Sequence, residues 1–394
     1  MNAALEAVER ALAHLEPSRL VRRAMVSLPF AGPFALVAFG KAAAAMTEGV
    51  LASRPDALAR GLVVIPEGSL APHRHRAVTV VEAPHPLPDA RSVRAAHRAA
   101  NIMASRLPVL ALVSGGASSL VAWPVEGLTL AQKRAIVADL LASGAPIQDV
   151  NLVRRHLSRV KGGGLLRFAG SRPVCSLIVS DVVSGRPEDI GSGPTVPSTG
   201  GLREARAVAR RWLGDRAERL PLHACSRRTA GASFVELASP ERLARRVAVE
   251  LRSHGLAASV GRLGASALEV VVRELLAESR RLAPRSAKVF AVETTLAVPK
   301  GRAGRGGRAS HLALRLAGEL PPEVSALVVA TDGVDGRSGH AGGLVDRDTF
   351  RGRSGELDAA LRTFDSGALL RERGAHVELP RGHNLTDLVV LSRP

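Results

Sequence analysis

The chain has 394 residues, of which 46% are apolar and 23% are charged, so it can bury a sizeable core and is not a disordered polypeptide. A length near 400 predicts two or three domains at ~150 residues each. The formal net charge is +18, but 49 of the 54 basic residues are arginines spread along the whole chain, and aromatic residues make up only 3%. The chain therefore has few aromatic side chains on which nucleic-acid bases could stack, and we expect no nucleic-acid partner.

The N-terminal segment predicts a helix rather than a targeting signal. Residues 1–20 have a helical apolar period but carry Glu6, Glu9 and Glu16 and no leader-like apolar stretch. No apolar run approaches the ~20 residues that a membrane-spanning helix needs. Cys175 and Cys225 provide neither a disulfide framework nor a CxxC metal spacing. We therefore expect a cytoplasmic protein with no membrane partner.

After this helix, short apolar runs alternate with helical patterns. Strands are predicted at 35–39, 62–65, 78–81, 109–113, 174–179, 289–298, 326–331 and 388–391. Helices are predicted at 41–50, 89–106 with Asp89 as the cap, 130–143, 147–160, 202–213, 240–254, 267–282, 308–316 and 366–373. This alternation predicts an α/β sheet covered on both faces, with right-handed crossovers. Residues 213–239 are predicted to be irregular, and a smaller domain is predicted to begin near residue 284, giving domains 1–283 and 284–394.

Ligands of open α/β sheets bind beyond the carboxyl ends of the strands, so the residues after each strand are the first candidates for a site. Lys41 lies directly after a strand at a helix N-terminus, where the dipole favours anions, and a ligand phosphate would resolve that conflict. After another strand come Ser114, Gly115, Gly116 and Ser118, small residues whose backbone N–H groups can converge on an anion. A solvated lysine and a tight structural turn are the alternatives.

Two later segments add candidates. Arg154 and Ser158 are spaced i, i+4 on one helix face, and Lys161 follows just before a run of glycines, although helix-end lysines are usually plain dipole partners. Asp181 ends a strand and is followed by Ser192-Gly193. Such a carboxylate could act as a general base or hold Mg²⁺, and a structural Asx-turn is the alternative.

The C-terminal part contains two loops of interest. Gly306-Gly307-Arg308 lies between a strand and a helix and could form an anion nest, while Asp332 and Asp335 follow a strand and could serve a metal or a turn. The spacings match neither a P-loop nor a dinucleotide-binding GxGxxG, and no HExxH, GxSxG or protein-kinase set occurs. Anion-friendly loops, strand-end acids and cations together suit phosphoryl transfer, in which positioning and charge neutralisation dominate catalysis.

The order of these motifs resembles that of the glycerate 2-kinase family, whose C-terminal part is called the MOFRL domain. The shared motifs run nearly end to end: Gly40–Ala43, Glu82–Asp89, Ser114–Gly116, Leu141–Ala145, Asn151–Gly163, Ser180–Val182, Ser192–Thr195, Glu293–Thr295, Gly306–Arg308, Thr331–Gly336 and Asn384–Leu388.

The resemblance implies a three-layer α/β/α Rossmann-like larger domain, a smaller C-terminal α/β domain and an active site in the cleft between them. It implies transfer of the γ-phosphate of ATP, with Mg²⁺, to the 2-hydroxyl of D-glycerate. Lys41 would contact phosphate or substrate, Asp181 would be the base or a metal-side carboxylate, and Arg308 would stabilise charge on the transferring group. Substrate or phosphate contacts are assigned to Ser114, Gly115, Gly116, Ser118, Arg154, Lys161, Ser192 and Gly193. Nucleotide contacts are assigned to Glu293, Gly306, Gly307, Asp332, Asp335 and Asn384. The oligomeric state is left undecided by the resemblance, and a homodimer is among the alternatives.

The chain departs from the family pattern in several loops. Residues 184–186 are Ser-Gly-Arg where the family has an acid, 290–292 are Phe-Ala-Val for Ser-Gly-Gly, and 309–311 are Ala-Ser-His for Asn-Gln-Glu. Because of these changes, a second interpretation stays open. In it the chain is a diverged paralogue that phosphorylates another polyol, sugar acid or pathway intermediate, or that binds its ligand without transferring a phosphoryl group. A nucleic-acid-binding protein is the third alternative. A hydroxypyruvate reductase is disfavoured, because it would need a dinucleotide fingerprint after the first strand.

Overall fold

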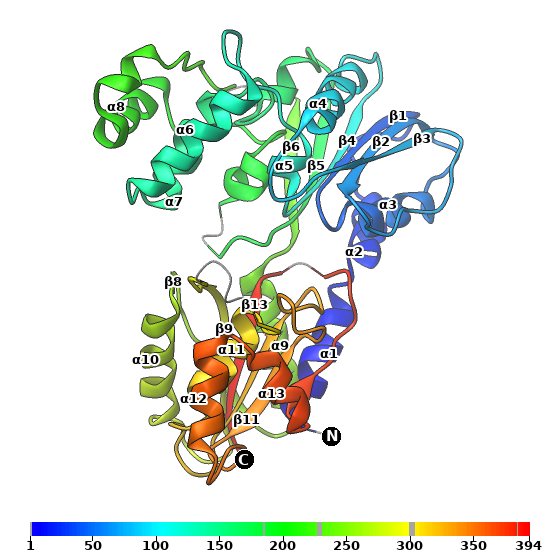
Figure 1. Ribbon diagram of the computed structural model, residues 1–394. Coiled ribbons are helices and arrows are strands. Elements are labelled where there is room, and N and C mark those ends of the chain that lie inside the picture. Colours follow the sequence, from blue (N-terminus) through cyan, green and yellow to red (C-terminus); the bar gives the residue numbers. More distant parts are fainter. Residues whose placement is uncertain (1, 184–185, 227–230, 299–303, 384) are drawn as a thin grey trace. The chain divides into compact units, whose positions relative to one another are not determined.

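The computed structural model describes residues 2–183, 186–226, 231–298, 304–383 and 385–394, and the chain forms two compact units (Figure 1). We call Pro17–Ser180 together with Arg186–Leu237 the parallel-sheet unit. We call Met1–Glu16, Asp181–Gly185 and Ala238–Pro394 together the mixed-sheet unit. The predicted break at residue 284 coincides with no boundary between these units, because the elements between residues 238 and 283 pack with the strands that follow them.

The parallel-sheet unit is built on six strands. They are β1 Phe34–Phe39, β2 Leu58–Pro66, β3 Val78–Ala83, β4 Val109–Ser114, β5 Val174–Val179 and β6 Ala232–Ala238, in the order β3-β2-β1-β4-β5-β6. Each neighbouring pair from β3 to β5 is parallel. β1, β4 and β5 are buried at every position, as expected for continuous apolar strands that are covered on both faces.

Helices complete three layers around this sheet. α3 (Ala43–Leu51) follows β1, and α4 (Ala90–Met103) joins β3 to β4. The chain moves from β1 out to β3 and then returns to β4, so right-handed crossovers place these two helices on opposite faces. The predicted α/β class is thereby confirmed, and so is the Asp89 cap, whose side chain accepts from the Arg91 backbone N–H at 2.7 Å. Strand order reverses between β1 and β4, which is where open sheets bind ligands.

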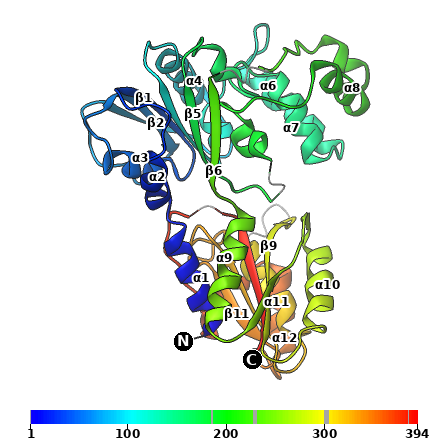
Figure 2. The same ribbon diagram turned by 180° about the vertical axis from the view of Figure 1, so that it is seen from behind.

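A helical cluster extends this unit away from β3, as Figures 1 and 2 both show. It comprises α6 (Leu130–Ala142), α7 (Ile147–His156), α8 (Leu202–Leu213) and the 3₁₀ helix η3 (Gly214–Arg219). Its core includes Leu140, Val153, Leu157, Ala205 and Ala209. The shorter elements of the unit are α2 Pro17–Met25, α5 Ala117–Leu120, η1 Gly164–Arg167 and η2 Pro187–Ser192.

The mixed-sheet unit holds the second sheet, in the order β12-β11-β10-β13-β9-β7, with β8 also paired to β9. Its strands are β7 Ala257–Val260, β8 Ala265–Ala267, β9 Ser286–Thr295, β10 Ser325–Ala330, β11 Gly342–Asp346, β12 His376–Val377 and β13 Asp387–Arg393. Neighbours from β12 to β9 are antiparallel, whereas β7 and β8 run parallel to β9. Its helices are α1 Ala3–His14, α9 Pro240–Ser253, α10 Leu268–Ser279, α11 Arg308–Ala317, α12 Ser354–Thr363 and α13 Ser366–Glu372.

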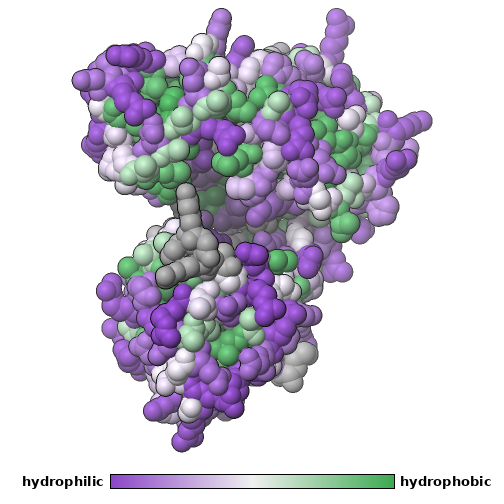
Figure 3. Space-filling model, in the orientation of Figure 1, coloured by the Kyte–Doolittle hydropathy of each residue, from purple (hydrophilic) through white to green (hydrophobic). Residues whose placement is uncertain are grey.

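Several elements differ from the predictions. The segment 213–239 was predicted to be irregular, but it contains η3 and the strand β6. β7, β11 and α12 were not predicted at all; β11 begins with Gly342-Gly343, which have no strand propensity, and it forms because β10 supplies its hydrogen bonds. No helix in the described ranges is long and apolar enough to cross a membrane. On the face in Figure 3, hydrophilic side chains cover each unit broadly, in keeping with the dispersed arginines.

Candidate functional site

The loop after β1 presents Lys41 at the point where the strand order reverses. Gly40 has φ +124°, and a Cβ there would lie 2.2 Å from the Ser114 Oγ, so only glycine fits. The Lys41 backbone N–H donates to the Gly115 carbonyl at 2.8 Å, and that of Ala42 donates to the Ser114 Oγ at 3.0 Å. The buried Ser114 hydroxyl therefore fixes the loops after β1 and β4 to one another, while the Lys41 side chain stays exposed.

Gly116 brings Lys41 next to His85. Its φ is +84°, and a Cβ there would lie 3.1 Å from the His85 ring and 3.3 Å from the Lys41 Cγ. Burial, and to a lesser degree the charge of Lys41, lowers the pKa of His85. The imidazole is therefore held neutral and adds no second charge beside Lys41.

Lys161 is held at the same end of the sheet by Ser118. Its Nζ donates to the Ser118 carbonyl and hydroxyl, both at 2.7 Å, and the Ser118 hydroxyl lies 3.1 Å from that of Ser192. The glycines after Lys161 bond to the same segment, since the backbone N–H of Gly163 donates to the Gly193 carbonyl at 2.7 Å. Four predicted residues, Ser118, Lys161, Ser192 and Gly193, are thus brought together.

A cavity of about 360 Å³ opens beside these residues, and we call it the cationic cavity. It is lined by His85, Pro86, Leu87, Pro88, Gly116, Ser118, Ser119, Ala122, Leu130, Lys133, Arg134, Val137, Ala138, Leu141, Arg154 and Lys161, with no acidic side chain among them. Lys133 and Lys161 are only 5% and 3% exposed. Burial, reinforced by neighbouring cations, lowers the pKa of Lys133 to about 7 and that of Lys161 well below its ordinary value. Burial likewise lowers the pKa of Arg154 to about 10.

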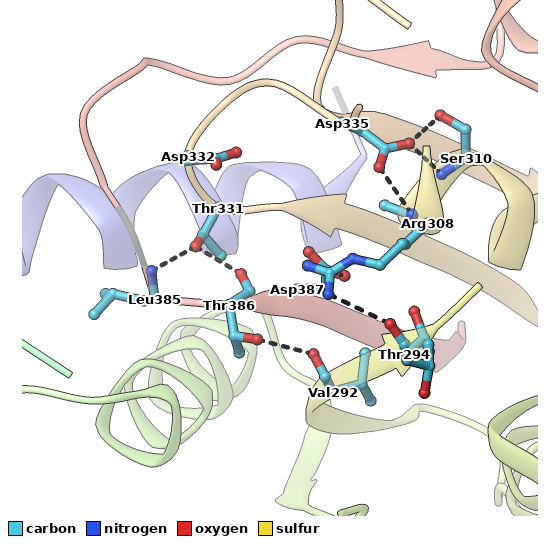
Figure 4. A network of polar contacts seen from close by, with 12 residues as sticks. Val292, Thr294, Arg308, Ser310, Thr331, Asp332, Asp335, Leu385, Thr386 and Asp387 are labelled. Atoms are coloured by element: carbon cyan, nitrogen blue, oxygen red, sulfur yellow. Dashed lines mark hydrogen bonds and ion pairs between the residues drawn. The ribbon is translucent and has the colours of Figure 1, made fainter. Parts of the chain in front are cut away.

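In the mixed-sheet unit, Asp335 caps α11 from a distant loop (Figure 4). Its carboxylate accepts from the backbone N–H groups of Ala309 at 3.0 Å and Ser310 at 2.7 Å, and from the Ser310 hydroxyl. The N-cap position is Gly307, which carries no capping side chain, and a Cβ there would lie 2.1 Å from the Asp335 Oδ1. Asp335 and Gly307, both predicted to bind nucleotide, therefore build the start of this helix.

Arg308, the first residue of α11, pairs with a buried acid. Its guanidinium lies 3.3 Å from the Asp387 Oδ2 and donates to the Thr294 carbonyl at 3.3 Å. Asp387 is 5% exposed, and burial raises its pKa to about 7 although Arg308 opposes the shift. Figure 4 shows the two side chains facing each other. The arginine is 44% exposed, so it can reach a ligand while Asp387 orients it.

A second cavity, of about 380 Å³, lies beside this pair. Its lining includes Gly306, Gly307, Arg308, Asp332, Asp335 and Asp387, so we call it the acidic cavity. Glu293 is exposed and lies within electrostatic reach of Arg308 and Asp181. His311 also lines the cavity, and its ring stacks on that of Phe364 with 5.5 Å between the ring centroids. Burial lowers the pKa of His311. Asn384 lies outside the described residues.

No group of three or more His, Cys, Asp or Glu side chains in the described ranges is arranged to hold a metal ion. Mg²⁺ in kinases is commonly bound through one or two carboxylates plus substrate phosphates, so a dense cluster is not required. Asp335 is engaged by α11 and Asp387 by Arg308. Asp332, which accepts from the Val334 backbone N–H at 3.2 Å and lines the acidic cavity, is better placed for a metal that arrives with phosphate.

The predicted residues thus divide into two sets. The parallel-sheet unit holds Lys41, Ser114, Gly115, Gly116, Ser118, Arg154, Lys161, Ser192 and Gly193, and the mixed-sheet unit holds Asp181, Glu293, Gly306, Gly307, Arg308, Asp332 and Asp335. Sequence reasoning missed Lys133 and Asp387 as lining residues, whereas His311 lies in one of the loops, 309–311, in which the chain departs from the family pattern. The scarcity of lysine was a signal for Lys133, since only five occur in the chain.

Two family models match the chain. A domain of unknown function, DUF4147, matches residues 3–221, and the MOFRL family matches residues 286–388. The second match begins near the predicted boundary at 284, whereas the packing units divide elsewhere.

Relatives carry two kinds of name. A putative hydroxypyruvate reductase of Agrobacterium vitis is 35% identical, covering 85% of this chain and 81% of the relative. A D-glycerate 2-kinase of Thermotoga maritima is 28% identical over 98% and 97%, and a glycerate 2-kinase of Pyrococcus horikoshii is 31% identical over 79% and 77%. The crystal structure of glycerate kinase from Thermotoga maritima superposes with a TM-score of 0.85 at 28% identity, covering 100% and 99% of the two chains.

Proposed function

Because the chain belongs to the glycerate 2-kinase family and is a kinase, we propose that it transfers the γ-phosphoryl group of ATP to the 2-hydroxyl of D-glycerate, giving 2-phosphoglycerate. The observation that carries this proposal is the Arg308–Asp387 pair at the start of α11, beside a glycine-rich loop that lines a cavity. Phosphoryl transfer needs such a fixed positive charge, because charge on the transferring group must be neutralised as it moves.

The residues take the following roles in this proposal. Arg308 stabilises charge on the transferring phosphoryl group, and Lys41 binds phosphate or the acid. Asp181 is the base for the acceptor hydroxyl or a metal-side carboxylate. The nucleotide is bound in the mixed-sheet unit through Gly306, Gly307 and Glu293. Mg²⁺ would be held by Asp332, with Asp181 as the other candidate, and would neutralise charge on the phosphates of ATP.

The glycine-rich loop is shaped for close approach of a ligand to the backbone. Gly306 packs against Ser366, where a Cβ would lie 2.3 Å from the hydroxyl, and its carbonyl accepts from the Arg337 backbone N–H at 3.0 Å. The loop is thereby held in one conformation before any ligand binds. A preorganised loop of this kind reduces the entropy cost of positioning a nucleotide.

The proposal is tested by measuring the release of ADP when the protein is incubated with ATP, Mg²⁺ and D-glycerate. We expect turnover that falls roughly 10²–10³-fold in Arg308→Ala, the usual cost of removing one charge-stabilising donor. Lys41→Ala and Asp181→Ala should also lose activity. Arg206→Met, which removes an exposed arginine of α8 outside both cavities, is the charge-matched control. Absence of turnover with D-glycerate and with a panel of hydroxy acids and sugar acids would refute the proposal.

The names of two relatives raise hydroxypyruvate reduction as a competing activity. A reductase must bind a dinucleotide, and the loop after β1 is Gly40-Lys41-Ala42-Ala43 rather than a GxGxxG turn. We therefore expect no oxidation of NADH or NADPH by hydroxypyruvate.

One observation favours a kinase with a different acceptor as the second candidate. The buried ring of His311 lines the acidic cavity and stacks on Phe364. An imidazole therefore lies beside Arg308 where the family pattern has the carboxylate of a glutamate. A panel of small polyols and sugar acids in the same assay separates the two, since a diverged enzyme would turn over another acid faster than D-glycerate.

A further inference from the structure

The cationic cavity holds a buried lysine, and no acidic side chain is among the described residues that line this cavity. Lys133 lies in the first turn of α6 and is 95% buried, and its Nζ has no hydrogen-bond partner among the described residues. An ammonium group has three donors, and burying them without acceptors is costly. An anionic ligand in the cavity would supply the missing acceptors.

The groups around Lys133 do not offset its charge. Arg154 on α7 and Lys161 line the same cavity, as do His85 and the exposed Arg134. The nearby acid Asp189 is paired with Arg155 at 3.0 Å and does not line the cavity. Lys161 has the carbonyl and hydroxyl of Ser118 as acceptors, so it is fixed in place but not neutralised.

We propose that Lys133, Arg154 and Lys161 form a binding site for a tetrahedral dianion, the phosphate group of a small phosphorylated acid or inorganic phosphate itself. The existence of this dianion site does not depend on the proposed function. Only the identification of its ligand as the phosphoryl group of the product rests on that function.

The number of cations and their directions favour phosphate over a carboxylate. A monocarboxylate brings one negative charge and two oxygens in one plane, so it offsets the charge of only one of the three basic side chains. A phosphate brings about two charges near neutral pH and oxygens that point in several directions. It can therefore meet cations that come from α6, from α7 and from the segment after α7. Burial strengthens each of these contacts, because the local dielectric is low.

The experiment measures binding by the full chain without turnover. Isothermal titration in buffer free of phosphate and sulfate compares inorganic phosphate, 2-phosphoglycerate, D-glycerate and ADP, for the parent protein, Lys133→Met and the control Arg206→Met. We expect phosphate and 2-phosphoglycerate to bind the parent more tightly than D-glycerate does. Lys133→Met should weaken phosphate binding about ten- to a hundredfold, the loss expected for one charge-assisted contact. ADP affinity should be unchanged in this variant.

Thermal melting shows whether Lys133→Met folds. Methionine has nearly the shape of lysine without the buried charge, so the ligand-free variant should melt at or above the temperature of the parent while its response to phosphate is reduced. Lys133→Gln serves as a second variant.

Three results would overturn the proposal: phosphate affinity unchanged in both variants, D-glycerate binding as tightly as phosphate, or ADP affinity reduced as strongly as phosphate affinity. A protein that binds phosphate at this cavity but shows no kinase turnover would instead refute the proposed function and leave the dianion site standing.

Discussion

Replacing Asp335 by alanine tests whether this residue builds the site or binds a ligand. The change removes the acceptor for two buried backbone N–H groups and one hydroxyl at the start of α11. Loss of a helix N-cap costs about 0.5–2 kcal/mol, and each buried donor left unsatisfied costs about 1–3 kcal/mol. Since Gly307 at the N-cap has no side chain that could accept these bonds instead, we expect the free energy of unfolding of the mixed-sheet unit to fall by about 3–5 kcal/mol. This is a large part of the ~5–15 kcal/mol that stabilises an ordinary domain.

Chemical denaturation followed by far-ultraviolet circular dichroism measures this loss. Tryptophan fluorescence is unsuitable, because Trp123 and Trp212 both belong to the parallel-sheet unit. Asp332→Ala is the matched control: it lines the same cavity but accepts one bond at 3.2 Å, so we expect a loss below about 1 kcal/mol. If Asp335→Ala costs no more than Asp332→Ala, the capping role is wrong and the carboxylate is free to serve a ligand.

Further outcomes follow from the same geometry. Asp387→Asn should remove a pH dependence of the free energy of unfolding. Because the folded-state pKa of Asp387 is raised to about 7, the stabilisation that its protonated form provides is complete below about pH 4 and is lost as the pH rises through 7. In urea melts, the parent should therefore lose up to ~4 kcal/mol between pH 4 and pH 7, and the variant should not. Gly40→Ala should cost about 2–4 kcal/mol in fluorescence-detected unfolding and lower kcat, because its Cβ meets the Ser114 hydroxyl at positive φ. Lys133→Arg should destabilise the ligand-free protein by about 2–3 kcal/mol in thermal melts at pH 8, whereas Lys133→Met should not, because an arginine cannot release its proton on burial.

The elements that sequence patterns predict well are those whose stability is local. β1 and β4 are continuous apolar runs that end at Phe39 and Ser114, and both fall within one residue of their predicted bounds. α4 starts at Asp89 because the cap is a side chain in the adjacent sequence. β6 was missed because it is an edge strand with little apolar signal whose partner β5 is distant in the chain, and β11 was missed because it begins with two glycines.

The candidate site divides in the same way. Residues directly after a strand, such as Lys41 and Asp181, could be selected by position alone. The role of Asp335 could not, because its partners in α11 lie 25 and 26 residues away. Lys133 also escaped prediction, since one lysine near the start of a helix has the same local pattern whether it faces solvent or a cavity.

The rarity of lysine gives the choice of cation at this cavity a physical meaning. With 49 arginines in the chain, a surface charge is arginine by default, yet Lys133 and Lys161 line the cationic cavity and Lys41 lies against its wall at Gly116. A buried lysine can give up its proton when the cavity is empty and regain it when an anion enters, whereas an arginine stays charged in both states. Lysine thus lowers the cost of keeping the cavity open without weakening the charged contacts once a ligand is bound. The pKa of about 7 for Lys133 means that anion binding above pH 7 takes up a proton, so phosphate affinity should decline as pH rises from 7 to 9.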